Sequence, residues 1–253
     1  MIPLKSEKDL QMLKIAGGIL VGVMQKLRES IKAGISTLEI DALAQTLIEN
    51  EKAIPAFKDY KGYPANICTS INEEIVHGIP SSRKLKEGDI ISLDVGINYK
   101  GYFSDLAITV GVGRIDTQAR KLIDVTKNAL SEGIRKAYPG NHLSDISYAI
   151  QSYVEASGFS VVREFVGHGI GNSLHEEPEI PNFGQPHQGS LIKSGMVLAI
   201  EPMVNVGAWR SKILENQWTA VTADGELSAH FEHTVAVTDK GPEILTRWPS
   251  RLV

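Results

Sequence analysis

The sequence predicts a mixed α/β (α+β) fold with two similar halves, residues 1–113 and 114–253, each combining a helix pair with an antiparallel sheet. Apolar residues recur at helical spacing at the start of each half, and the pattern then changes to the alternation typical of half-buried strands. Residues 106 positions apart also show a weak similarity, which either an internal duplication or chance would explain. With 253 residues, 42% of them hydrophobic, we expect a single domain.

Two helices are expected in the first half. Ser6 and Asp9 form a capping box at the start of a long amphipathic pattern. A second capped pattern begins near Ser36 and must end before Pro55, because proline cannot donate the backbone hydrogen bond that a helix interior needs. Residues 60–79 follow neither periodicity clearly and are expected to be rich in loops.

A β-hairpin is expected to complete the first half. Between Ile90 and Val112 apolar and polar residues alternate, so that one face of the first strand is apolar and the other is mixed. A turn centred on residues 98–101 would place Asp94 directly opposite Asp105. Two carboxylates would then share one face of the sheet.

The second half repeats this plan. Residues 117–137 and 143–156 have helical periodicity, and the Pro139-Gly140 pair separates them. Strand-like runs follow to the end of the chain. If the halves are related, a site formed by both would lie between them.

Composition restricts the class of partner. The 26 basic and 30 acidic residues are interspersed and give a net charge of -4, which argues against stable binding to nucleic acid. The amino-terminal residues lack the pattern of a secretory signal, and no run approaches the roughly 18 apolar residues that span a bilayer. A single cysteine, Cys68, permits no internal disulfide. We therefore expect a cytoplasmic protein without a membrane partner.

The paired aspartates indicate a cation. Like charges opposite each other destabilise a sheet, and burial adds a desolvation cost, so Asp94 and Asp105 would need a metal ion or a shared proton. A metal ion is the simplest remedy. Taken alone, two such aspartates more often face solvent at a frayed edge, and it is their surroundings that favour the metal.

Two histidines in or beside a glycine-rich segment extend the same pattern. His168 lies among the glycines of residues 167–171, where a sharp bend would leave the imidazole uncrowded, and His175 follows. The phosphate-binding pattern G-x-G-x-x-G ends here on Asn172, and the zinc pattern H-E-x-x-H meets Glu179 in place of its second histidine. A lone histidine is more often structural, so it is the pair that favours a metal ligand.

Two glutamates complete a set of metal-binding side chains. Glu201 interrupts one apolar segment and Glu232 opens another, although either could be an edge residue facing water. Together with Asp94 and Asp105 they carry four negative charges, which two divalent cations would neutralise. Oxygen ligands with one imidazole suit Mn, Fe, Co or Zn, and shared carboxylates hold paired ions about 3.5–4 Å apart.

Five separated motifs resemble the methionine aminopeptidases of the creatinase-like pita-bread fold, in order and spacing: INEEIVHGIP, LDVGINYKGYFSD, GHGIGNSLHEEP, AIEPMV and FEHTVAVT. The resemblance covers nearly the whole chain and is best to the compact type I enzymes. It implies a pseudo-twofold fold, a dinuclear metal centre and an enzyme that hydrolyses the initiator methionine from nascent polypeptides. A small second residue would be preferred.

The resemblance also implies roles for individual residues. The metal ligands would be Asp94, Asp105, His168, Glu201 and Glu232. A water or hydroxide between two divalent cations would attack the first peptide carbonyl, with Glu201 accepting its proton. His175 would contact the reacting carbonyl or its oxyanion, and His77 the scissile amide, although the residues alone leave His77 as a possible structural loop residue.

The methionine pocket implied by the resemblance is apolar and aromatic. Its residues would be Tyr60, Tyr63, Cys68, Leu174 and Trp218, together with His77 and His175; aromatic rings and a thiol are good partners for a thioether. Phe57 stands where the family pattern suggests cysteine, and Leu174 where it suggests phenylalanine. Both change the shape of the pocket, so the side-chain preference stays open.

Two other functions fit the same fold. An X-Pro aminopeptidase or related dipeptidase would share the metal ligands, but such enzymes usually carry an additional amino-terminal domain, for which the helix near Ser6 leaves no room. A binding protein without metals would be expected to lack the ligands that are filled here. We expect a monomer that meets its substrate near the ribosome.

Overall fold

The computed structural model describes residues 2–248. Its helices are α1 (Glu7–Ser30), α2 (Thr37–Asn50), the 3₁₀ turn η1 (Tyr60–Gly62), α3 (Thr117–Ile134) and α4 (Leu143–Ala156). Its strands are β1 (Ile54–Pro55), β2 (Cys68–Ile71), β3 (Glu74–Val76), β4 (Ile90–Tyr99), β5 (Tyr102–Gly111), β6 (Ser160–Val161), β7 (Val166–Gly169), β8 (Glu176–Pro181), β9 (Val197–Ile200), β10 (Met203–Asn205), β11 (Ser211–Ile213), β12 (Ala220–Thr222), β13 (Ser228–His230), β14 (His233–Thr238) and β15 (Gly241–Ile244).

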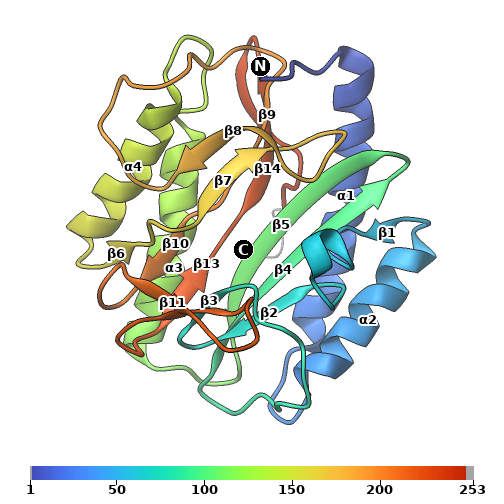
Figure 1. The fold of residues 1–253 in the computed structure, drawn as a ribbon, viewed down its shortest axis with the longest axis vertical. Coiled ribbons are helices and arrows are strands. Elements are labelled where there is room, and N and C mark those ends of the chain that lie inside the picture. The colour runs from blue at the N-terminus through green and yellow to red at the C-terminus, as the bar shows by residue number, and fades with distance from the viewer. Residues whose placement is uncertain (1, 249–253) are drawn as a thin grey trace.

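Two helix pairs flank a set of antiparallel sheets. α1 and α2 lie on one side of the strands and α3 and α4 on the other (Figure 1). One sheet contains β1, β4, β2 and β5, and a second has the order β15-β14-β9-β7-β8. Two smaller sheets, β13-β10-β6 and β11-β12-β3, complete the fold. The expected mixed fold of helix pairs and antiparallel sheets is confirmed.

The two halves correspond element by element at the spacing noted in the sequence. α4 begins and ends 106 positions after α2, and β6 follows β1 at the same spacing. Gly34 and Gly140, which stand at this spacing before those helices, share a φ of 92°. Backbone conformation is thus repeated where side-chain identity has largely diverged.

The predicted helices are present with small differences at their ends. Both capping boxes form, since the Ser6 and Ser36 hydroxyls accept from the backbone amides of Asp9 and Glu39. α1 ends at Ser30 rather than at Gly34. α1 is long and apolar enough by length and composition to cross a bilayer, contrary to the sequence expectation. Its apolar face instead packs against β4 and β5, as in the core helix of a globular protein.

The predicted hairpin forms, but with a different register. Tyr99 pairs with Tyr102 across a two-residue turn, and Asp94 pairs with Ala107 rather than with Asp105. The turn residues Lys100 and Gly101 both have positive φ, at 54° and 86°, as tight hairpins require. Because the register differs from the expected one by an even number of residues, Asp94 and Asp105 remain on one face as diagonal neighbours.

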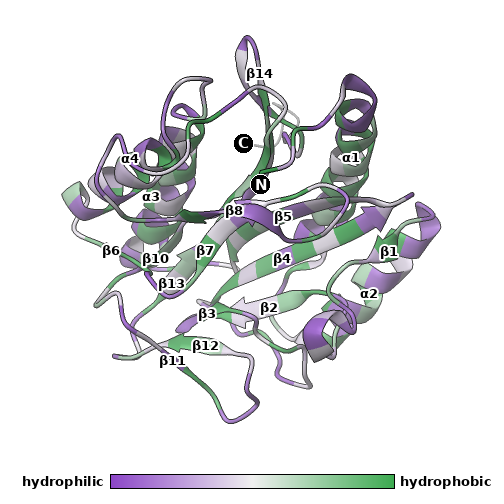
Figure 2. Ribbon diagram, turned by 45° about the horizontal axis from the view of Figure 1, so that its top comes forward, coloured by the Kyte–Doolittle hydropathy of each residue, from purple (hydrophilic) through white to green (hydrophobic). Residues whose placement is uncertain are grey.

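The expected loop-rich segment at residues 60–79 is partly wrong. It contains η1, β2 and β3, and β2 pairs with β4 so that Cys68 lies opposite Asp94. These strands are short and buried, so they show no alternation of polar and apolar residues. In Figure 2 the helices carry both hydrophilic and hydrophobic stretches, as expected for helices with one exposed and one packed side.

Candidate metal centre and peptide pocket

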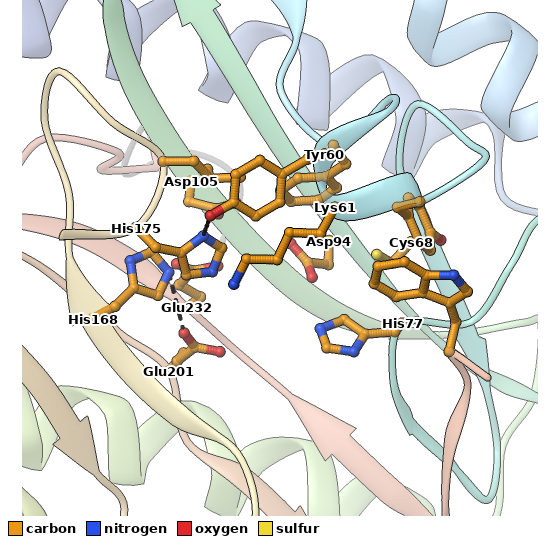
Figure 3. Close-up of a pocket in the computed structure, with 14 residues that line it drawn as sticks. Tyr60, Lys61, Cys68, His77, Asp94, Asp105, His168, His175, Glu201 and Glu232 are labelled. Atoms are coloured by element: carbon orange, nitrogen blue, oxygen red, sulfur yellow. Dashed lines mark hydrogen bonds and ion pairs between the residues drawn. The ribbon is translucent and has the colours of Figure 1, made fainter. Parts of the chain in front are cut away.

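A cavity of about 250 Å³ lies between the two halves and gathers every site residue singled out in the sequence. Its lining consists of Phe57, Tyr60, Lys61, Tyr63, Cys68, His77, Asp94, Asp105, His168, Leu174, His175, Glu201, Trp218 and Glu232. Figure 3 shows His168, His175 and Glu201 on one side of the cavity, and Cys68 and His77 on the other. Acidic and imidazole groups therefore meet an apolar, aromatic wall in one cavity.

Three ligand-type side chains from three separate segments converge. The carboxylates of Asp105 and Glu232 and the imidazole of His168 place ligand atoms within 4.8 Å of one another, and all three residues are buried. Backbone bonds hold the carboxylate-bearing segments together: the Glu232 amide donates to Ala107, and the Asp105 amide donates to the Thr234 hydroxyl. The hairpin of the first half is thus fixed to the carboxy-terminal strands of the second.

His168 lies in strand β7 rather than at the sharp bend expected for this glycine-rich segment. The register of β7 with β8 shifts between His168 and Gly169, which re-aims the side chain. The glycines serve close packing and not a bend, since a Cβ at Gly167 would lie 2.4 Å from the carbonyl oxygen of Ala199. Nδ1 lies 2.9 Å from the Gly169 carbonyl, which can only accept. The Nδ1 proton is fixed there, and Nε2 keeps its lone pair for a metal ion.

The carboxylates of the cavity are electrostatically frustrated. Burial raises the pKa of Asp105 to about 7, and burial together with the negative charge of Asp105 raises the pKa of Asp94 well above its ordinary value. Burial and neighbouring acids also raise the pKa values of Glu201 and Glu232. Four neighbouring acids with these pKa shifts need compensating positive charge to be ionised at neutral pH.

The donor set fits divalent cations. Asp94 Oδ1 and Glu232 Oε1 are buried and have no hydrogen-bond partner within residues 2–248. An unpartnered buried carboxylate oxygen is costly unless an ion binds it. Burial lowers the pKa of His168 to about 4, so the ring is neutral and can act as a ligand. Oxygen-rich ligation with one neutral imidazole is typical of Mn, Fe, Co or Zn sites.

Glu201 follows β9 directly, where the chain passes from the five-stranded sheet to β10. Its Oε1 lies 3.6 Å from Nε2 of His168, and its Oε2 lies 3.4 Å from Nε2 of His230. Burial lowers the pKa of His230 to about 3, so these are contacts with neutral rings and not ion pairs. Glu201 therefore lies between two imidazoles within reach of the cavity.

Sequence reasoning missed His230 and Lys61. Both ring nitrogens of His230 are buried without a hydrogen-bond partner in the described chain, although the ring lies against Glu201. Its position two residues before Glu232 was the available signal. The nearby His233 does not line the cavity, and its Nδ1 pairs with the hydroxyl of Thr246. Lys61, an exposed residue of η1, lines the mouth with its ammonium group directed into the cavity (Figure 3).

The two other predicted histidines are held by different means. His175 places Nδ1 3.0 Å from the Tyr60 hydroxyl and stacks on that ring, and its ring lies 4.1 Å from that of His168. His77 has a φ of 59°, a left-handed conformation that costs about 1–3 kcal/mol in a non-glycine residue. Its ring packs edge-on against Phe165 and Trp218. Such strain is often kept where a side chain must point into a site.

The far wall of the cavity is apolar and rigid. The Tyr63 hydroxyl reaches the carbonyls of Ile67 and Gly78, and its ring packs edge-on against Trp218 at 5.1 Å. Burial raises the pKa of the Cys68 thiol, so it stays protonated. Phe57 occupies space that a side chain at position 96 would fill, since a Cβ on Gly96 would lie 2.5 Å from the Phe57 ring.

Comparison with known proteins agrees with this arrangement. The profile of metallopeptidase family M24 matches residues 11–239. The methionine aminopeptidase of Clostridium perfringens is 52% identical over 246 residues, which cover 97% of this chain and 99% of that protein. The crystal structure of methionine aminopeptidase from Rickettsia prowazekii matches with a TM-score of 0.97 at 40% identity, covering 98% of this chain and 100% of that one.

A more distant match concerns the fold alone. The prolidase from Pyrococcus horikoshii is 22% identical, with a TM-score of 0.80 over 99% of this chain and 65% of that one. The predicted pita-bread fold is confirmed by these structures. The extent and identity of the matches show that this chain belongs to metallopeptidase family M24, among the methionine aminopeptidases.

Proposed function

We propose that this protein hydrolyses the N-terminal methionine of nascent polypeptides and prefers a small second residue. The observation that carries the proposal is the juxtaposition, in one cavity, of four acids, two of them buried and two partly buried, with an apolar and aromatic wall. The acids suit a metal-assisted hydrolysis, and the pocket suits one unbranched apolar side chain. We further propose that the reaction takes place in the cytoplasm on monomeric enzyme, near the ribosome and without stable binding to nucleic acid or membrane.

The proposed metal ligands are the side chains with free donor atoms in the cavity. Asp94, Asp105, His168, Glu201 and Glu232 would hold two divalent cations, of Co, Mn, Fe or Zn. Bound there, the cations would lower the pKa of a water molecule and polarise the first peptide carbonyl. Their charge would also allow all four acids to ionise at neutral pH, against the raised pKa values of the metal-free site.

The protein side chains supply proton transfer and positioning. Glu201 lies between His168 and His230 and would accept the proton released by the attacking water. His175 would donate to the carbonyl oxygen as negative charge develops on it, because the Tyr60 hydroxyl orients its ring. His77, across the cavity, would contact the scissile amide. Each role follows from position in the cavity and from the family resemblance.

Substrate selection would follow from the two ends of the cavity. Tyr63, Cys68, Leu174 and Trp218 form the buried end, with Phe57 beside them, and would surround the methionine side chain. Tyr60, His175 and Lys61 lie nearer the mouth and would limit the size of the second residue.

A peptide assay separates the three functions considered. Purified enzyme with added Mn or Co is expected to release methionine from Met-Gly-X and to leave X-Pro bonds intact. Cleavage only of X-Pro bonds would indicate a dipeptidase-like activity instead. Absence of any cleavage, with metal shown to be bound, would leave a binding protein. Anomalous scattering from crystals would count and identify the cations in the same preparation.

His230 is expected to position Glu201. Replacing His230 with alanine should lower kcat by about tenfold or more, the range measured for residues that orient metal ligands or catalytic groups. Glutamine should largely restore kcat, because its amide can still donate to the carboxylate. His233→Ala is the control, since it removes a partly buried imidazole from the same segment that does not line the cavity. If kcat falls equally in the two alanine variants, His230 contributes only to packing and does not position Glu201.

A further inference from the structure

A second cluster of metal-ligand side chains lies outside the cavity, at the start of α4. His142 precedes α4, Asp145 lies in its first turn, and His187 belongs to the segment between β8 and β9. One ligand atom from each residue lies within 4.8 Å of the others. The connecting segment runs beside α4 (Figure 1). None of the three residues lines the cavity.

Asp145 holds the two histidines in place through their backbone. Its Oδ2 accepts from the amide of His142 and its Oδ1 accepts from the amide of His187, both at 2.8 Å. Nδ1 of His187 also lies 3.4 Å from Oδ1. Each carboxylate oxygen accepts one backbone hydrogen bond here and has lone-pair capacity for another partner. The carboxylate thus organises two imidazoles and remains able to bind a cation.

The two imidazoles approach from different directions. Their ring centroids are 6.4 Å apart and the ring planes are nearly perpendicular, at 82°. His187 has a φ of 62°, which brings its side chain toward α4, and 80% of that side chain is exposed. Rotation of this exposed ring can bring its nitrogen to within a metal bond length, about 2.0–2.2 Å, of an ion that the other two ligand atoms also contact. The site is therefore near ligand geometry but open to solvent.

We propose that His142, Asp145 and His187 form a surface site for Zn²⁺, with solvent completing the coordination. Two imidazoles and one carboxylate are a zinc-type set, whereas Mg²⁺ and Ca²⁺ favour oxygen ligands throughout. The amino end of α4 opposes a cation, and Asp145 offsets this, so the surface site should bind more weakly than the acidic cavity.

Zinc at this site would tie the segment after β8 to α4. That segment begins at Asn182, whose side-chain amide donates to the backbone carbonyl of Glu201 at 3.0 Å. The bound zinc would therefore restrict the motion of a segment that contacts the cavity residue Glu201, and it would add no group to the cavity itself. The expected consequence is a rise in the unfolding temperature that tracks occupancy of the surface site.

Calorimetric titration tests the site on intact enzyme. The protein is first saturated with Zn²⁺, freed of weakly bound metal, and then titrated with further Zn²⁺. The wild type is expected to bind one additional equivalent, and His187→Ala to lose it. The double variant His142→Ala/His187→Ala should behave in the same way. Gln188→Ala, an exposed residue of the same segment, is the matched control and should keep the additional equivalent.

A second readout identifies the ligands directly. In NMR spectra the ring carbon-bound protons of His142 and His187 should shift together, at the stoichiometry found by calorimetry. Unchanged cleavage of the methionyl peptide by His187→Ala would show that the fold and the cavity are intact. An additional equivalent that persists in the double variant, or that is missing from the wild type, overturns the proposal. The number of zinc equivalents bound tests the surface site independently of the proposed peptidase activity.

Discussion

Replacing Glu201 with glutamine is expected to lower kcat at least about 100-fold, the lower range for loss of a general base. The carboxylate oxygens of Glu201 lie 3.6 Å from Nε2 of His168 and 3.4 Å from Nε2 of His230, and both rings are neutral because burial lowers their pKa values. Glutamine preserves size but cannot accept the proton. Steady-state kinetics with a methionyl tripeptide at saturating Mn measures the change.

Metal content must be measured beside kcat, because Glu201 is also a proposed ligand. If kcat falls only in proportion to lost metal, the proton-acceptor role is removed and the ligand role stands. Glu179→Gln is the matched control, since this exposed glutamate lies on strand β8 of the same sheet and does not line the cavity. It should retain normal kcat and normal metal content.

Local sequence signals predicted the helices and the hairpin well. The capping residues Ser6 and Ser36 predicted two helix starts correctly, because a capping box involves residues only three positions apart and is therefore visible in the local sequence. The hairpin register was wrong because the turn was centred on residues 98–101, whereas Lys100 and Gly101 alone occupy it. The prediction that Asp94 and Asp105 share one face of the hairpin is still correct, because side chains alternate between the two faces with a period of two residues.

Long-range arrangement could not be predicted from periodicity. β2 and β3 are short and buried on both faces, so only pairing with β4 and β12 defines them. Asp105, His168 and Glu232 come from three distant segments of the chain. Their approach was predicted from the family resemblance and could not be predicted from the spacing of residues. His230 lies outside the family motifs that were recognised, and its position two residues before Glu232 is a weak local signal, because a lone histidine is more often structural.

Removing the metal is expected to reverse the effect of pH on stability near neutrality. In the metal-free fold, burial raises the pKa of Asp105 to about 7 and those of Asp94, Glu201 and Glu232 further above their ordinary values. The unfolded chain has already released these protons at about pH 6.5. The folded protein therefore binds more protons, and its stability falls as pH rises from about 6.5 to 8.

The size of this effect follows from proton linkage. Each excess proton bound by the folded state changes the free energy of unfolding by about 1.4 kcal/mol per pH unit, so a loss of at least about 1 kcal/mol is expected over this interval. Below about pH 6.5 the buried histidines act in the opposite direction, because burial lowers the pKa of His168 to about 4 and keeps it neutral. Above about pH 6.5, the pH dependence of stability therefore reports on the carboxylates and not on the buried histidines.

Urea unfolding at three pH values, with chelator or with excess Mn, measures both slopes. The metal-loaded enzyme should gain stability with pH, because ligands must be deprotonated to bind. Asp105→Asn should flatten the metal-free slope and raise metal-free stability, since it removes one buried charge, while weakening metal binding. Parallel slopes with and without metal would mean that the four acids are not held together by cations, and the proposed hydrolysis would lose its physical basis.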